Sequence, residues 1–214
     1  HVCYRGLVKA DKLKRPIAPG AIAGPGRHFV MYYLRNGEWV NFVAQHEEKE
    51  WKEESWTTIG DADALRLLYQ DWDPEVTELL SHVDDTFKWA LYSRPALERW
   101  SDGRVCLIGD ACHPTLPNLA SGAAMAIEDG YIIAELLERY GDDIPTAFKQ
   151  FYKLRIARCT KIQKASRRMA KLFHIRSPLE RALKHSAIIG LSKLAPQLAA
   201  RQMTWTHHYN ALTA

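Results

Sequence analysis

A carboxylate at the end of an apolar run and a glycine at the start of a helical pattern are the groups of this sequence best suited to bind a ligand. Asp110 follows the run Val105–Ile108, and Gly122 precedes a long segment with helical periodicity. An aspartate at the carboxyl end of a strand lies where α/β folds bind ligands, and it accepts hydrogen bonds from hydroxyl groups. A helix N-terminus offers unpaired N–H groups and a partial positive charge. Together these groups suit a ligand with several hydroxyl groups and an electron-rich ring.

The residues around Gly122 are small enough to let such a ligand approach the backbone. Ala123 and Ala124 follow Gly122, so a flat ring could lie close to the first turn of the helix. The opposing interpretation is a strand–loop–helix unit in which Asp110 only caps a turn. Spacing alone leaves both interpretations open.

A strand, a loop and a helix must position these groups. The apolar run Val105–Ile108 is typical of a fully buried strand, and a loop that contains Pro114 and Pro117 follows it. From Gly122 to Tyr140 the pattern is helical, and Gly141 is a natural end for this helix. A stripe of small residues along the helix would allow close packing against a neighbour. The small-residue stripe consists of Ala123, Ala126, Gly130 and Ala134.

The first part of the chain is predicted to be mainly β-structure and the last part helical. Asn36-Gly37 lies between two runs rich in β-branched and aromatic residues, which predicts a hairpin, whereas the segment 16–26 is predicted to be a loop. Asp61 and Asp73 are placed to cap two short helices, the second with Pro74 at its first position. The other expected elements are strands at 2–8 and 86–92, a charged surface segment at 47–54, and helix over 144–176 and, after a break at 175–178, to about residue 200.

The segment 103–129 resembles the second flavin motif of the FAD-dependent aromatic hydroxylases, the class that includes salicylate hydroxylase and hydroxynicotinate monooxygenase. That motif is a strand ending in Gly-Asp-Ala-x-His-Pro, then a further proline, Gln-Gly-Ala and a helix with Glu-Asp. This sequence has Gly109–Pro114, Pro117, Ser121-Gly122-Ala123 and Glu128-Asp129 in the same order, with Ser121 in place of the usual Gln. The segments 3–8 and 24–44 and the residues Arg94, Pro95, Trp100, Arg155 and Arg158 also resemble the family.

The resemblance implies a FAD-binding role for the motif. Asp110, after Gly109, would bind the ribityl chain of FAD, and Pro117 would lie beside the isoalloxazine ring. The backbone N–H groups from Gly122 through Ala123 to Ala124 would face the N1/C2 carbonyl edge of the flavin, where a helix N-terminus stabilises negative charge on the reduced ring. His113 is interpreted as a structural member of the flavin loop. No metal is expected.

By the same resemblance, His28 and Tyr32 face a small aromatic substrate and act in catalysis. They are four residues apart, so in a strand they point to the same face. The alternative is a strand with an exposed histidine and a core tyrosine. The resemblance also implies that NAD(P)H reduces FAD, that O₂ gives a flavin C4a-hydroperoxide, and that a phenolic acid such as salicylate is hydroxylated. A base must deprotonate the phenol; His28 is one candidate, and a group outside this sequence is another.

The GxGxxG fingerprint that holds the pyrophosphate of FAD does not occur in this sequence. The nearest match, Gly24-Pro25-Gly26, lacks the third glycine. We therefore expect the C-terminal part of a flavoprotein, which needs a further N-terminal half and binds FAD weakly or not at all by itself. The predicted fold is α+β: a mixed β-sheet substrate domain over 1–98, the second half of a FAD-binding domain over 99–141, and C-terminal helices over 142–214. A homodimer is one expectation for the assembly, and a non-catalytic binding domain is an alternative to the enzyme.

Charge is unevenly distributed along the chain. Residues 151–214 hold 13 of the 29 Lys and Arg residues but only one acidic residue, Glu180. Such a segment could bind nucleic acid or a membrane surface. Apolar residues share these helices, however, so we interpret the charges as the solvated face of packed helices and expect neither partner.

Composition excludes several classes of protein. A hydrophobic fraction of 47% and a charged fraction of 25% are values of globular proteins, not of chains that are disordered throughout. The apolar runs are too short for a transmembrane helix. The four cysteines match no zinc-binding spacing, so free thiols in a cytoplasmic protein are expected.

Overall fold

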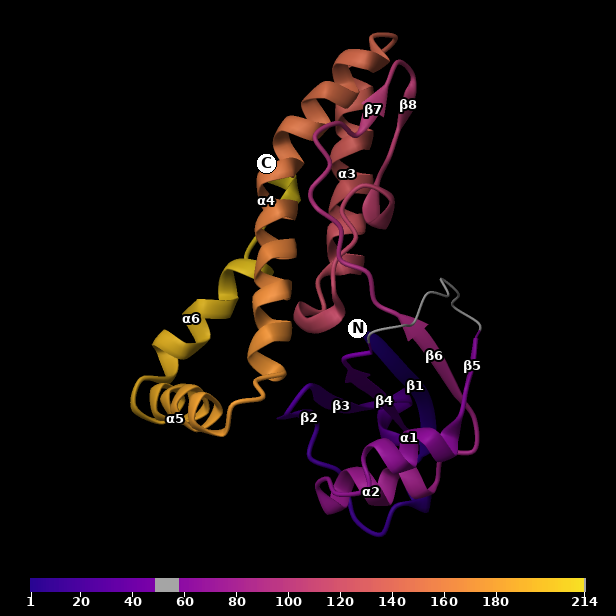
Figure 1. The fold of residues 1–214 in the computed structure, drawn as a ribbon. Coiled ribbons are helices and arrows are strands. Elements are labelled where there is room, and N and C mark those ends of the chain that lie inside the picture. The colour runs from indigo at the N-terminus through magenta and orange to yellow at the C-terminus, as the bar shows by residue number, and fades with distance from the viewer. Residues whose placement is uncertain (49–57, 214) are drawn as a thin grey trace. The chain divides into compact units, whose positions relative to one another are not determined.

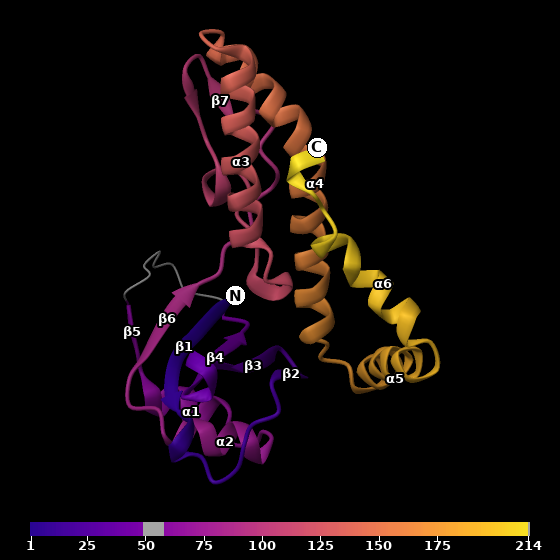
Figure 2. The same cartoon turned by 180° about the vertical axis from the view of Figure 1, so that it is seen from behind.

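The structure, a computed structural model, describes residues 1–48 and 58–213, with side chains in the range 199–203 left out. Residues 49–54 of the predicted charged surface segment therefore lie outside the described part. The chain forms two compact units. The first consists of His1–Leu91 and Phe173–Ser177, and the second of Tyr92–Leu172 and Pro178–Ala214 (Figure 1, with the reverse view in Figure 2).

The first unit is built on a six-stranded sheet in the order β2-β3-β4-β1-β6-β5, and every described strand pair in it is antiparallel. The strands are β1 (Val2–Lys9), β2 (Gly20–Gly24), β3 (Arg27–Leu34), β4 (Trp39–His46), β5 (Ile59–Gly60) and β6 (Thr86–Ala90). The predicted hairpin forms from β3 and β4, with Leu34 opposite Trp39. Its turn residues Arg35, Asn36 and Gly37 all have positive φ, a conformation that Asn and Gly adopt readily.

One segment predicted to be a loop contains a strand. Residues Gly20–Gly24, within the predicted loop 16–26, pair with β3 at the edge of the sheet, so that prediction is wrong. Ile22 of this strand packs against the core. Gly24 is required by a close approach, since a Cβ there would lie 2.9 Å from the indole of Trp72. Because glycine is typical of loops, the glycines at both ends of this segment favour a loop in the sequence. A strand at the edge of a sheet tolerates them.

Two short helices, α1 (Ala62–Leu68) and α2 (Pro74–Ser81), cover one face of this sheet (Figure 1). Both predicted caps are confirmed: the carboxylate of Asp61 accepts hydrogen bonds from the N–H groups of Asp63 and Ala64, and that of Asp73 from the N–H of Glu75. The helices bury residues such as Leu65 and Leu79 against Phe29, Met31 and Phe42 of the strands. Because side chains alternate along a strand, His28 and Tyr32 point to the opposite face.

The second unit is mainly helical. Its elements are the hairpin strands β7 (Ser101–Asp102) and β8 (Val105–Cys106), and the helices α3 (Gly122–Tyr140), α4 (Ile144–Phe173), α5 (Pro178–Leu194) and α6 (Pro196–His207). The predicted start of α3 at Gly122 and the break between α4 and α5 are confirmed. Trp100, Met125 and Phe151 belong to the core of this unit, and α3 and α4 run side by side (Figures 1 and 2). The α+β fold class is confirmed.

The run Val105–Ile108 does not form the fully buried strand that was predicted. In the described part of the chain, β8 pairs only with β7, and the side chains of Val105 and Ile108 are 69% and 46% exposed. The small-residue stripe of α3 is exposed as well, at Ala126 and Gly130 among others. Apolar composition predicts burial only where a neighbouring layer covers the strand, and no described element does so here.

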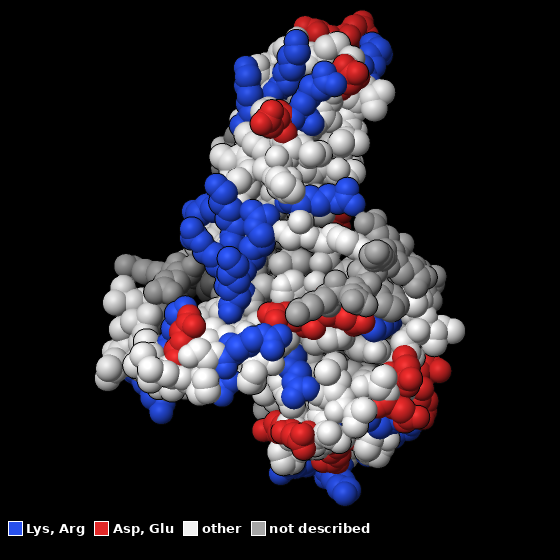
Figure 3. Space-filling view, viewed as in Figure 1, with Lys and Arg blue, Asp and Glu red and all other residues white. Residues whose placement is uncertain are grey.

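The basic segment gives α4 a charged surface. Exposed Lys and Arg side chains gather along this helix (Figure 3). They include Lys161, Lys164, Arg168 and Lys171. Among the described residues, no helix combines the length and the apolar character needed to cross a membrane.

Candidate functional site

Asp110 and the N-terminus of α3, which the sequence singles out as ligand-binding groups, lie next to each other. The side chain of Asp110 is exposed, and a Cβ built on Gly122 would lie 3.9 Å from its Oδ1 atom. A short turn over Gly109–Ala111 aims this side chain, and Gly109 adopts a positive φ of 58° there. A carboxylate acceptor therefore stands directly beside the first turn of a helix.

The N-terminus of α3 carries no side-chain cap within the described part of the chain. Ser121 occupies the cap position, but its hydroxyl donates to the carbonyl of Leu119 instead (2.8 Å). The first N–H of the helix that donates to a backbone carbonyl is that of Met125, which binds the carbonyl of Ser121 (3.0 Å). The amides of Gly122, Ala123 and Ala124 come before it and have no such partner within the helix. Ala123 and Ala124 are exposed, so these amides and the positive end of the helix dipole are open to an acceptor group.

The loop that carries Pro117 is fixed by two polar side chains of α4. Gln163 donates to the carbonyl of Pro114 (2.9 Å), and the hydroxyl of Ser166 donates to the carbonyl of Leu116 (2.6 Å). Pro117 itself is exposed at the start of a short 3₁₀ turn. The loop is thus held rigidly from behind while its proline faces outward.

A buried carboxylate, Asp129 of α3, ties the Gly109 turn to α4. Its Oδ2 atom accepts hydrogen bonds from the Gly109 N–H (2.9 Å) and from Nε2 of His113 (2.6 Å). Its Oδ1 atom accepts one from Nε of Arg155 (2.7 Å). Arg155 also pairs with Glu128. This network holds in place the Gly109 turn, which also contains Asp110.

The pKa values of Asp129 and His113 indicate that both side chains are charged. Burial alone would raise the pKa of Asp129, but hydrogen bonds from His113 and the Gly109 N–H outweigh it and lower the pKa. Burial alone would lower the pKa of His113, but hydrogen bonds, foremost that with Asp129, raise it to about 12. An imidazolium and a carboxylate therefore face each other inside the second unit. Cys112, His113 and Asp129 lie close enough together to bind a metal ion. Their ligand atoms already take part in hydrogen bonds and in the His113–Asp129 ion pair.

The two residues predicted to face a substrate lie in the first unit. His28 is only 1% exposed, and its Nδ1 atom lies 2.7 Å from Nε2 of His174. Tyr32, on the same face of β3, is 38% exposed. Opposite them on β4 lie Gln45 and Asn41, both buried polar residues. The alternative of an exposed histidine with a core tyrosine does not describe this strand.

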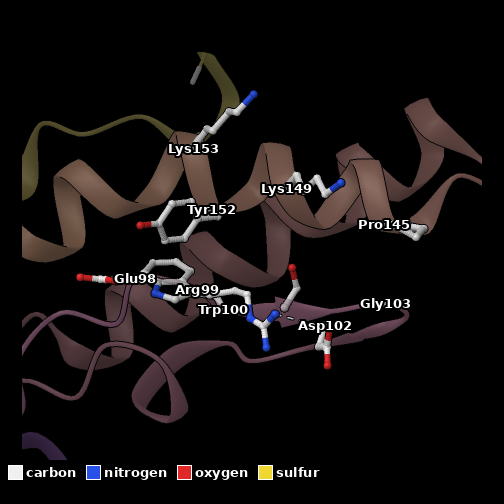
Figure 4. Close-up of a pocket in the computed structure, with 10 residues that line it drawn as sticks. Glu98, Arg99, Trp100, Asp102, Gly103, Pro145, Lys149, Tyr152 and Lys153 are labelled. Carbon is white, nitrogen blue, oxygen red and sulfur yellow. Dashed lines mark ion pairs between the residues drawn. The ribbon is translucent and has the colours of Figure 1, made fainter.

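A pocket of about 520 Å³ opens elsewhere in the second unit, between the β7–β8 hairpin and α4 (Figure 4). Trp100 and Tyr152 form its aromatic wall, with their rings perpendicular and 5.4 Å apart, and Lys149 and Lys153 extend from α4. None of the predicted flavin-binding residues lines this pocket. The predicted FAD site is therefore an open surface around α3 and not this cavity.

Sequence reasoning missed several residues that support the site. Asp129 appeared only as part of the Glu-Asp pair of the motif, although a helical aspartate between apolar residues with Arg155 downstream was a usable signal. Gln163, Ser166 and His174 carried no signal, because their partners lie far away along the chain.

A carboxylate beside an uncapped helix N-terminus, after a glycine turn, suits a cofactor that carries hydroxyl groups and a flat ring. The profile of the family described as FAD binding domain matches residues 21–141. The chain belongs to this family, that of the FAD-dependent aromatic monooxygenases, and the resemblance seen in the sequence is confirmed.

Individual relatives agree with this assignment. A 3-hydroxybenzoate 6-hydroxylase of Polaromonas naphthalenivorans (strain CJ2) is 32% identical over 98% of this chain and 52% of the relative. The 3-amino-4-hydroxybenzoate 2-monooxygenase PtnB3 of Streptomyces platensis is 33% identical over 82% of this chain and 45% of the relative. A salicylate hydroxylase solved as a substrate complex superposes with a TM-score of 0.79 at 25% identity, over 99% of this chain and 55% of that one. The chain spans about half the length of the curated relatives it matches.

Proposed function

We propose that this chain supplies the ribityl-binding and ring-binding side of the FAD site, together with a wall of the substrate site, in an aromatic hydroxylase. The observation that carries the proposal is the exposed Asp110 carboxylate beside the uncapped N-terminus of α3. FAD, when bound, supplies the redox chemistry by taking electrons from NAD(P)H and passing them to O₂. A small aromatic compound with a hydroxyl group receives one oxygen atom.

Each flavin-binding residue has a distinct task in this proposal. Asp110 accepts a hydrogen bond from a ribityl hydroxyl. The amides of Gly122, Ala123 and Ala124, aided by the helix dipole, donate to the carbonyl edge of the ring and stabilise negative charge on it. Pro117 packs beside the ring, where its lack of an N–H leaves no donor to compete.

The substrate wall is formed by the face of β3 that carries His28 and Tyr32. Burial, and next the charge of His174, lower the pKa of His28 to about 3, so its imidazole is neutral near pH 7. A neutral imidazole accepts a hydrogen bond from a phenol and orients the ring. Tyr32 lies on the same face and is partly exposed, and in this proposal it contacts the aromatic ring of the substrate. Names of the relatives, which act on hydroxybenzoates, support a hydroxylated aromatic acid as the substrate.

A chimera tests this proposal directly. The chain is fused to the GxGxxG-bearing segment of the Polaromonas naphthalenivorans 3-hydroxybenzoate 6-hydroxylase, and FAD affinity and substrate-stimulated NAD(P)H oxidation are measured. We expect a yellow protein whose oxidation of NAD(P)H rises with 3-hydroxybenzoate or salicylate. Asp110→Ala removes a hydrogen bond to a charged group worth about 1.5–3 kcal/mol. FAD binding should therefore weaken roughly 10- to 100-fold.

The matched control is Asp102→Ala. Asp102 is also an exposed aspartate of the second unit, and its ion pair within the described residues is with Arg99, at 3.7 Å. This variant should bind FAD as the parent chimera does. Equal FAD affinity of the Asp110→Ala and Asp102→Ala chimeras would remove Asp110 from the flavin site and refute the proposal.

A further inference from the structure

Two histidines that are distant in the sequence meet ring to ring within the first unit. Nδ1 of His28, on β3, lies 2.7 Å from Nε2 of His174, which follows the end of α4. Both residues are almost fully buried, and the ring of Phe173 packs against His28 with the centroids 4.9 Å apart. A contact this short between neutral imidazoles requires one ring to donate its proton and the other to accept it.

Backbone hydrogen bonds hold the two rings in this arrangement. The N–H of Gly26 donates to the carbonyl of His174 (3.3 Å), and the N–H of Glu47 donates to the carbonyl of Gly26 (3.0 Å). On the other side of β3, the hydroxyl of Tyr69 donates to the carbonyl of His28 (3.1 Å). The segment that carries His174 is therefore fixed to the sheet that carries His28.

A carboxylate faces the second ring nitrogen of His174. Oε1 of Glu47 lies 3.6 Å from Nδ1 of His174, while Oε2 of Glu47 binds the guanidinium of Arg176 (2.5 Å). Other groups that act on His174 are the ring of His1, 5.1 Å away, the amino group of His1 and the guanidinium of Arg176. Burial lowers the pKa values of both His28 and His174, so the two rings form a neutral pair.

Glu47 decides which of the two rings donates. If His174 donated from Nε2, its Nδ1 lone pair would face the Glu47 carboxylate, and two regions of negative charge would oppose each other. If His174 instead accepts at Nε2, its proton lies on Nδ1 and points toward the carboxylate. His28 must then donate from Nδ1, which leaves its own lone pair on Nε2.

We propose that Glu47 and His174 are positioning residues that hold His28 in its Nδ1–H tautomer and so present the Nε2 lone pair as the acceptor for the substrate hydroxyl. The catalytic meaning of this tautomer rests on the substrate-binding role proposed above for His28. The tautomer itself follows from the geometry of the two rings and of Glu47, and it can be measured without flavin or substrate.

Nitrogen NMR of the whole 214-residue chain, labelled with ¹⁵N-histidine, tests the tautomer near pH 7.5. His28 and His174 are assigned by substitution. We expect Nδ1 protonated and Nε2 bare for His28, with Nδ1 also protonated for His174. Glu47→Gln replaces the carboxylate by an amide that can donate as well as accept. The preference of His28 for Nδ1–H should then fall roughly tenfold or more, toward an equal mixture of tautomers.

Glu48→Gln is the matched control. Glu48 is the adjacent acidic residue, but it pairs with His46 and Lys88, so the nitrogen shifts of His28 should not move. A backbone amide spectrum confirms that both variants keep the fold. An Nε2–H tautomer of His28 in the parent chain, or unchanged His28 shifts in a folded Glu47→Gln variant, would overturn the proposal.

The active chimera separates this inference from the proposed function. There, Glu47→Gln should lower substrate-stimulated turnover at saturating substrate and leave FAD affinity unchanged, whereas Glu48→Gln should alter neither. If His28→Ala keeps full turnover while NMR shows the expected tautomer, the tautomer assignment stands and His28 is removed from the substrate site. If Glu47→Gln shifts the tautomer but His28→Ala alone abolishes turnover, Glu47 and His174 lose their positioning role.

Discussion

Around Asp129, donors from separate parts of the second unit converge on one buried carboxylate. The backbone of Gly109, the imidazole of His113 and the guanidinium of Arg155 all bind it at 2.6–2.9 Å. A buried carboxylate of this kind is tolerated because both of its oxygen atoms accept hydrogen bonds and two of the donors carry positive charge. The turn that carries Asp110, which binds the ligand in our proposal, is thus held by a buried residue outside the proposed binding surface.

The raised pKa of His113 leads to a prediction about stability and pH. Its folded-state pKa of about 12 lies above the ordinary value of 6.5, so the folded chain keeps a proton that the unfolded chain releases between these values. The stabilisation is complete below pH 6.5 and is lost as pH rises, by up to about 1.4 kcal/mol per pH unit. In His113→Gln, which still donates a hydrogen bond but does not titrate, this loss should be absent.

Urea unfolding between about pH 6 and 9 measures this difference. The gap in unfolding free energy between the parent chain and His113→Gln should shrink as pH rises. His208→Gln, which changes an exposed histidine of the same unit, should run parallel to the parent. A constant gap for His113→Gln would show that His113 is neutral in the folded chain.

Strand, turn and helix meet at Gly109, and the turn depends on a glycine there. Gly109 has a φ of 58°, and an added Cβ would lie 3.3 Å from the Cβ of Ala126 on α3. Gly103, in the β7–β8 hairpin, has a φ of 55° but open space around its Cβ position. The two positions share the same backbone strain and differ only in crowding.

Alanine substitutions at these two glycines should therefore separate strain from crowding. Gly103→Ala should cost about 1 kcal/mol of unfolding free energy, because a left-handed conformation disfavours a Cβ. Gly109→Ala should cost more, because the turn must also move away from α3, and it should weaken FAD binding in the chimera. Denaturant unfolding of both variants provides the comparison. Equal losses of unfolding free energy would mean that α3 moves away at Ala126 without a measurable loss of stability.

Local patterns in the sequence predicted most elements, and long-range partners account for what they missed. The caps at Asp61 and Asp73, the hairpin at Asn36-Gly37 and the start of α3 each depend on residues close together in the chain, so they were predictable. The strand Gly20–Gly24 was missed because pairing with β3, and not its own composition, makes it a strand. The prediction that Val105–Ile108 is buried was wrong. An apolar run favours burial, but it does not reveal whether another element covers the strand.

The same limit applies to the candidate site. Asp110, Pro117 and Gly122 come from one continuous motif, and the structure places Asp110 beside Gly122. Their binding roles stay predictions until FAD affinity is measured. His174 and Gln163 reach the site from distant positions, and a single sequence carries no record of such contacts.

At the scale of the whole molecule, the basic C-terminal segment partly neutralises acidic residues of the earlier sequence. Arg155 and Arg158 pair with Asp129 and Glu128 in the second unit, and Arg176 pairs with Glu47 in the first. Part of the charge asymmetry is therefore internal, which lessens the need for an anionic partner.

The 214-residue chain by itself should bind FAD more weakly than micromolar affinity. It carries the groups that we propose bind the ribityl chain and the ring, but its sequence has no GxGxxG loop for the pyrophosphate. Losing those contacts removes several hydrogen bonds to charged oxygens. Fluorescence titration with FAD measures the affinity, and riboflavin, which has no pyrophosphate, serves as the control ligand. Tight, stoichiometric FAD binding by this chain would contradict the expectation.

The contact between His28 and His174 also sets an order of events in folding. The two residues are separated by 146 positions, and closing so long a loop is entropically costly, so such contacts form after local ones. During synthesis, β3 and β4 can pair as a hairpin long before His174 leaves the ribosome. The surroundings of His28 are therefore completed only after residue 174 has been made, and a chain cut before residue 173 would leave Nδ1 of His28 without the ring of His174.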